Sequence, residues 1–135
     1  MSNVTWNYVE PLKAGQDISF LELEIKYHYQ LPDDLRNCIK LNNGGIPDKS
    51  KFDTQDNTLV FGGLLSFNED GTDTVYSYIP LFETEGNTVE MFPFGLDPFG
   101  NLFCIENGKV VLYNHEEDTA TILAETFTEF IEKLY

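Results

Sequence analysis

Two β-rich runs on either side of Asn107-Gly108 constrain the fold of this chain more than any other sequence feature. LFCIE (102–106) precedes the dipeptide and KVVLY (109–113) follows it. Asn-Gly favours the type I′ turn, whose twist matches that of two paired antiparallel strands. The sequence therefore predicts a β-hairpin over 101–113, and the fold must contain antiparallel sheet.

Other runs predict further strands and the loops between them. We expect strands over 59–67, 75–82, 88–94 and 121–124. Gly62-Gly63 breaks the first of these runs, which indicates a bulge or a close backbone approach. Pro80 places the second run at a sheet edge or ends it there. Residues 46–58 are polar and rich in turn-forming residues, so we expect a loop in that segment.

Helices are expected on both sides of these strands. Pro32 suits a first helical turn and Asn43-Gly44-Gly45 supplies residues that tolerate positive φ, so 31–43 is predicted to be a helix. Near the end of the chain, Thr126 and Glu129 have the spacing of a capping box. The apolar stripe that follows this box contains Phe127, Phe130, Ile131 and Leu134.

The segment LELEIKYHYQ (21–30) fits two structures. Its apolar and polar residues alternate with period two, which is typical of a strand. A helix is favoured by the capping-box spacing of Ser19 and Glu22 and by the i,i+4 pair of Glu22 with Lys26. The apolar face of that helix would contain Ile18, Leu21, Ile25 and Tyr29. The pattern alone does not decide between the two.

Taken together, the expected elements indicate an α+β fold, with a central antiparallel sheet, N-terminal helices and a C-terminal helix packed on it. The 135 residues are expected to form one domain over 1–135, in which 1–16 is an extended arm or a short strand. Aromatic residues make up 14% of the chain, so a core of this size can be well filled.

Acidity is the main compositional signal for function. Eight basic and 23 acidic residues give 8 − 23 = −15. Such a chain repels phosphate groups, which argues against binding nucleic acid or an anionic membrane surface. A basic protein partner would instead be attracted and steered towards it. The alternative that the charge serves only solubility stays open.

No catalytic or metal-binding constellation is visible in the sequence. Nucleotide-binding glycine motifs, GxSxG and HExxH are all lacking. His115 is followed by acidic residues, but adjacent residues of one turn rarely converge on a metal ion. Cys38 and Cys104 lie among apolar neighbours and are interpreted as core residues. We therefore expect no enzyme activity, no cofactor and no metal.

The beginning of the chain bears on its location. Residues 1–15 lack a charged region followed by an apolar run, so no signal peptide is expected. No apolar run approaches the roughly 18 residues that a membrane span needs. The sequence therefore predicts a cytoplasmic protein.

Short motifs occur in a distinctive order along residues 18–135. The order is Glu24, Leu31-Pro32, Asn43-Gly44-Gly45, Phe61-Gly62, Phe92-Pro93-Phe94-Gly95, Asp97, Phe99-Gly100-Asn101, Asn114-His115-Glu116 and, in the closing helix, Thr126-Phe127, Phe130 and Leu134. This order and its spacing resemble the SUKH superfamily, which includes the fungal cell-wall assembly regulator and many bacterial immunity proteins. The chain departs from that pattern at His28, where a glycine is common, and in 46–58, where no motif matches.

The resemblance implies a helix over 21–30, the α+β fold described above and a function in binding rather than catalysis. Its bacterial members bind a toxin domain and protect the cell that produces it. We therefore expect an immunity protein whose partner is a cognate protein toxin, with a regulatory scaffold of the cell-wall regulator type as the alternative. The candidate contacts are the acidic loop residues Asp53, Asp56, Glu69, Asp70, Asp73, Glu83, Glu85, Glu116, Glu117 and Asp118.

Overall fold

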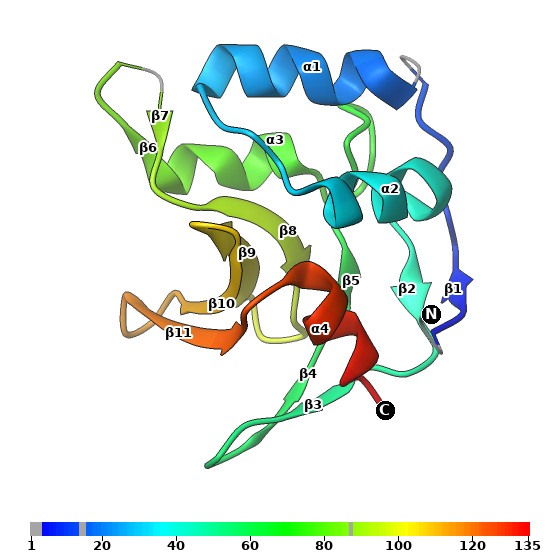
Figure 1. Cartoon of the computed structure of the whole chain (residues 1–135), viewed down its shortest axis with the longest axis vertical. Helices are drawn as coiled ribbons and strands as arrows, with labels where there is room; N and C mark the ends of the chain where they lie inside the picture. Colours follow the sequence, from blue (N-terminus) through cyan, green and yellow to red (C-terminus); the bar gives the residue numbers. More distant parts are fainter. Residues whose placement is uncertain (1–3, 14–15, 87) are drawn as a thin grey trace.

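The centre of the protein is a five-stranded antiparallel sheet with the strand order β11-β10-β9-β8-β5. A computed structural model describes residues 4–13, 16–86 and 88–135 of the chain. The strands of this sheet are β5 (Gly63–Leu64), β8 (Phe92–Leu96), β9 (Leu102–Glu106), β10 (Lys109–Asn114) and β11 (Thr119–Ala124). β11 and β5 form the two ends of the strand order (Figure 1).

The hairpin of β9 and β10 confirms the strongest sequence prediction. Asn107 has φ 51° and Gly108 has φ 79°, which are the two positive angles of a type I′ turn. Lys109 pairs with Glu106 and Val110 with Ile105, so the strands pair directly from the turn outward. This hairpin occupies the middle of the sheet.

Helices cover the sheet as the α+β prediction requires. The helices are α1 (Gln16–Tyr27), α2 (Asp33–Asn42), α3 (Val75–Tyr78) with the 3₁₀ helix η1 (Ile79–Phe82), and α4 (Phe127–Glu132). In Figure 1, α1, α2 and α3 lie together on one side of the sheet, and the C-terminal α4 lies next to α2. Thr126 caps α4 as predicted, since its side chain accepts a hydrogen bond from Glu129 N at 3.0 Å.

The predicted strand over 75–82 is wrong, because that segment forms α3 and η1. The Thr74 side chain accepts a hydrogen bond from Ser77 N at 3.2 Å and starts the helix. Pro80 lies in the first turn of η1, where a missing N–H costs nothing. Val75, Ile79 and Phe82 are buried. Their spacing is that of one face of a helix, although the segment is rich in residues that favour strands.

Segment 21–30 is helical up to Tyr27, but two residues of the predicted apolar face do not lie in the core; Tyr29 does pack against the core, and the side chain of Ile18 lies outside the described residues. Phe20, Leu23 and Tyr27 are buried, whereas Leu21 and Ile25 are 56% and 65% exposed. Ser19 is not a cap, because α1 already begins at Gln16. Just after the helix, His28 has φ 53° and Tyr29 N bonds to Glu24 O. His28 thus takes the left-handed conformation for which a glycine is favoured after a helix.

Residues 46–58 are not the loop that was predicted. The segment contains β2 (Ile46–Pro47) and β3 (Lys51–Asp53) and reaches the start of β4 (Thr58–Val60). β2 pairs with β1 (Trp6–Asn7) of the N-terminal segment, and β3 pairs with β4. Two backbone hydrogen bonds of 3.0 Å also join Lys51 to Tyr135. Long-range backbone pairing therefore orders a stretch whose polar composition indicates a loop.

The predicted strands 59–67 and 88–94 are each divided in the structure. The first is shared between β4 and β5, which Phe61 and Gly62 separate. The second contains β7 (Thr88–Val89) and the start of β8, and β7 pairs with β6 (Glu83–Thr84). β6 and β7 form a small acidic hairpin at the periphery of the fold (Figure 1).

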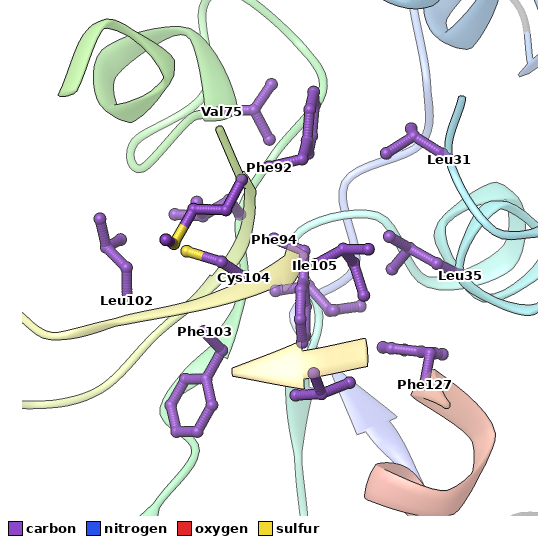
Figure 2. Close-up of a cluster of buried hydrophobic side chains, with 14 of the residues drawn as sticks. Leu31, Leu35, Val75, Phe92, Phe94, Leu102, Phe103, Cys104, Ile105 and Phe127 are labelled. Carbon is purple, nitrogen blue, oxygen red and sulfur yellow. The ribbon is translucent and has the colours of Figure 1, made fainter. Parts of the chain in front are cut away.

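A cluster of phenylalanine rings fills the core. The ring centroid of Phe61 lies 5.0 Å from that of Phe103, 5.3 Å from that of Phe130 and 6.1 Å from that of Phe94. Figure 2 shows the apolar side chains of the sheet gathered with Leu35 of α2 and Phe127 of α4. Edge-to-face ring pairs stabilise such a core beyond the area that they bury. The cluster joins the sheet, α2 and α4 into one packed unit.

Replacing one ring of this cluster should destabilise the fold. Phe130 is fully buried, so we expect Phe130→Ala to lower the free energy of unfolding by about 3–5 kcal/mol. The matched control is Phe99→Ala, which should change it by less than about 0.5 kcal/mol because Phe99 is 77% exposed. Urea denaturation measures both. Equal losses in the two variants would contradict this account of the core.

Candidate functional site

Residues of several motifs that resemble the SUKH pattern line one open groove of about 470 Å³. We call it the glycine groove, and its lining is Tyr8, Glu10, Gly44, Ile46, Gly62, Gly63, Leu64, Leu65, Thr72, Asp73, Leu96, Asp97 and Pro98. It therefore includes residues of the Asn-Gly-Gly, Phe-Gly and Asp97 motifs, which are far apart in the sequence. The sheet, the end of α2 and the N-terminal segment all contribute walls.

Asn43 fixes the N-terminal segment that forms one wall of this groove. Its side chain is buried and donates hydrogen bonds to Glu10 O at 2.9 Å and to Ser66 Oγ at 3.1 Å. It accepts one from Phe67 N at 2.8 Å, and its own backbone oxygen accepts one from Glu10 N at 2.8 Å. Because a buried amide must satisfy both its oxygen and its nitrogen, this one side chain sets the position of three segments.

Glycines let the backbones under the groove approach closely. A Cβ atom at Gly62 would lie 2.7 Å from Leu96 O, and one at Gly95 would lie 2.3 Å from the Phe61 ring. Gly62 N donates to Leu96 O at 2.8 Å, so this close approach is also a hydrogen-bonded contact. Any larger residue at either position would push β8 away from Phe61.

Asp97 organises the turn between β8 and β9. Its Oδ1 accepts hydrogen bonds from Phe99 N at 2.8 Å and Asn101 N at 2.7 Å, and its Oδ2 accepts one from Asn101 Nδ2 at 3.0 Å. Gly100 in the same turn has a positive φ of 88°, which a glycine adopts readily. His115 Nε2 lies 3.1 Å from Phe99 O, so its ring supports the same turn.

The turn and the N-terminal segment both present aromatic side chains to solvent. Phe99 is 77% exposed, and Tyr8, which lines the glycine groove, is 82% exposed. Tyr8 also has φ 58°, an unfavourable angle for a residue other than glycine. Neither residue is among the contacts predicted from the sequence. The turn signals Pro98 and Gly100 mark Phe99 as a turn tip, but no local signal marks Tyr8.

The ten acidic residues predicted as contacts are all exposed, but they lie in several places. Asp73 lines the glycine groove. Glu69 and Asp70 line a shallow groove near Lys13, which forms an ion pair with Asp70. Asp53 and Asp56 line a third groove between the β3–β4 hairpin and β11. Each of these grooves therefore holds at most two of the ten.

The remaining predicted contacts belong to two turns. Glu83 and Glu85 lie on the β6–β7 hairpin. Glu116, Glu117 and Asp118 form the turn between β10 and β11. Asn114 Oδ1 accepts hydrogen bonds from the backbone N–H groups of Glu116 and Glu117 at 3.0 and 3.1 Å, and Tyr113 OH donates to Asp118 Oδ1 at 2.7 Å. This second turn therefore holds its carboxylates on a defined backbone.

The two cysteine thiols lie in environments that keep them protonated. Burial raises the pKa of the Cys38 thiol to about 11 and that of Cys104 well above its usual value. Both thiols are therefore protonated at neutral pH and are weak nucleophiles. Over 4–13, 16–86 and 88–135, no group of three or more His, Cys, Asp or Glu side chains is placed to hold a metal ion.

Comparison with protein families decides the identity of this fold. The model of the SMI1/KNR4 family (SUKH-1) matches residues 16–133. The chain belongs to this family. No curated protein and no solved structure matches it. The matched range contains all the residues that line the glycine groove except Tyr8 and Glu10 of the N-terminal segment.

Among the residues that the structure describes, no helix has the length and apolar character needed to cross a membrane.

The acidic β3–β4 hairpin of this SUKH-1 chain leads to a pH prediction. Tyr135 OH donates to Asp53 Oδ1 at 2.6 Å and Thr58 Oγ1 donates at 2.8 Å, and these bonds lower the pKa of the Asp53 carboxyl. Tyr135→Phe removes the largest of these effects, so it should raise that pKa towards its ordinary value. A carboxyl NMR pH titration measures the shift. Tyr8→Phe is the control, and an equal shift in both variants would contradict the prediction.

Proposed function

We propose that the protein is a cytoplasmic, non-enzymatic immunity protein that binds a toxin domain and neutralises it by covering its active face. The observation that carries this proposal is the charge of the glycine groove. Its lining, as far as the described part of the chain forms it, contains Glu10, Asp73 and Asp97 and no Lys, Arg or His. The whole chain has 23 − 8 = 15 more acidic than basic residues, so at least that many carboxylates lack a cation of their own.

This charge points to a basic partner. Toxins that act on nucleic acid bind phosphate groups through Lys and Arg side chains. A carboxylate surface attracts the same side chains, increases the rate of association and competes with the nucleic acid. A nuclease or another nucleic-acid-acting toxin therefore suits this surface best.

Two exposed aromatic residues extend the same proposal. Side chains of Tyr and other aromatic residues account for much of the binding energy at many protein interfaces. Tyr8 lies at the glycine groove and Phe99 lies on the turn that Asp97 stabilises. We assign them as anchors, with the exposed acidic loops providing the charged surroundings.

Co-expression with a candidate toxin domain, such as one encoded by a gene adjacent to this one, tests the proposal. We expect the two proteins to co-purify, and we expect their affinity to fall as the salt concentration rises because the attraction is electrostatic. Failure to co-purify, or an affinity that does not change with salt, would contradict it.

A pair of charge-reversal variants locates the contact. Asp73→Lys places a cation in the glycine groove, so we expect it to weaken binding by about tenfold or more. Glu132→Lys makes the same charge change on α4, away from that groove, and should have a much smaller effect. Equal losses of affinity in the two variants would show that only the net charge of the protein matters. The glycine groove would then have no part in the proposal.

A further inference from the structure

β11 forms an open edge of the central sheet. Within 4–13, 16–86 and 88–135, the only strand paired with it is β10. The strand TATILA (119–124) contains no charged residue, no proline and no glycine. Edge strands present unpaired N–H and C=O groups, and natural proteins often block such edges with charged residues or proline. Residues 119–122 are exposed, with Ile122 at 59%, so this edge is accessible to another strand.

A groove lies over the β10–β11 pair, next to this edge. We call it the edge groove; it has a volume of about 490 Å³ and is lined by Phe52, Asp53, Thr54, Gln55, Asp56, Asn57, Leu59, Leu112, Thr121, Ile122, Leu123 and Lys133. The β3–β4 hairpin forms one wall and β11 with β10 forms the other (Figure 1). A segment that enters it would therefore meet an apolar strand on one side and carboxylates on the other.

The register of β11 limits how far a new strand can pair. Ile122 pairs with Val111 and Ala124 pairs with Val110, so Leu123 has no partner and forms a bulge. A bulge bends and twists an edge and stops regular pairing beyond it. The run available to another strand is therefore 119–122.

Acidic residues select what can pair with this run. Glu116, Glu117 and Asp118 precede β11 and Glu125 follows it. If a second copy of the chain paired antiparallel with β11, acidic ends would face acidic ends, and like charges in such positions are destabilising. A segment with Lys or Arg residues would instead place cations next to these carboxylates.

The carboxylates of the edge groove also favour a segment that carries Lys or Arg. Asp53 is held in place by hydrogen bonds from Tyr135 and Thr58, and Asp56 lies on the same hairpin. The one cation of its lining, Lys133, forms an ion pair with Glu129 at 3.2 Å. The carboxylates of the groove therefore remain available to an incoming cation.

We infer that the free edge of β11 binds an extended, Lys- or Arg-bearing segment of a partner protein by β-strand addition. Backbone hydrogen bonds to 119–122 provide affinity, and the carboxylates of the β3–β4 hairpin and the β10–β11 turn select a basic segment. The inference rests on the proposed function in that it names how part of a basic partner binds. It also gives a role to five of the predicted contacts, namely Asp53, Asp56, Glu116, Glu117 and Asp118.

A synthetic peptide of alternating Val and Lys tests this inference on the full chain. At millimolar peptide and low salt, we expect hydrogen exchange of alternate amides in 119–122 to slow by about tenfold or more, because every second N–H of an edge strand points outward. A peptide with Glu at each Lys position should have little effect. No slowing with the Lys peptide, equal slowing with both peptides, or a stable dimer of the chain alone would overturn the inference.

Two variants with the same charge change provide the control. Ile122→Lys places a cation on the edge and should weaken Lys-peptide binding by about tenfold or more. Leu81→Lys alters a residue that is similarly exposed, at 62%, and lies outside the edge groove, so binding should be retained. Equal weakening in the two variants would overturn the inference.

The peptide and toxin experiments distinguish this inference from the proposed function. If the toxin co-purifies and the peptide does not bind, only this inference fails. If the peptide binds and no toxin co-purifies, only the proposed function fails.

Discussion

The packing of Phe61 against the rings of Phe94, Phe103 and Phe130 connects the two grooves to which we assign partner binding. Phe61 directly follows β4, so its position fixes one end of the acidic hairpin beside the edge groove. It directly precedes Gly62, which lines the glycine groove. Both grooves therefore depend on the same buried ring.

Polar residues then place the surface features on this core. Asn43 ties the N-terminal segment to the sheet, and Asp97 shapes the turn that carries Phe99. Each side chain has its hydrogen bonds satisfied by backbone and side-chain groups of other residues, so these bonds fix the local backbone. In this chain the Asn-Gly-Gly and Asp97 motifs thus have a positioning role.

Local signals predicted the elements that local chemistry controls. The Asn107-Gly108 hairpin and the Thr126 cap follow from residues close together in sequence, and both are present. The strand predicted over 75–82 failed because β-formers there also have helical spacing, and the Thr74 cap decided the outcome. The loop predicted over 46–58 failed because partners distant in the sequence, such as Tyr135, pair with it. Acidic residues were correctly expected on the surface, but only tertiary structure shows which of them share a groove.

These features support one account of the molecule, in which a rigid aromatic core displays carboxylates around two grooves; we propose that a basic protein binds there. Hydrogen exchange of the full chain, alone and in complex with the co-purified toxin domain, tests that account most directly. It predicts slower exchange in 119–122 and around the two grooves, with little change along α1. Slowing confined to α1, with both grooves unaffected, would contradict it.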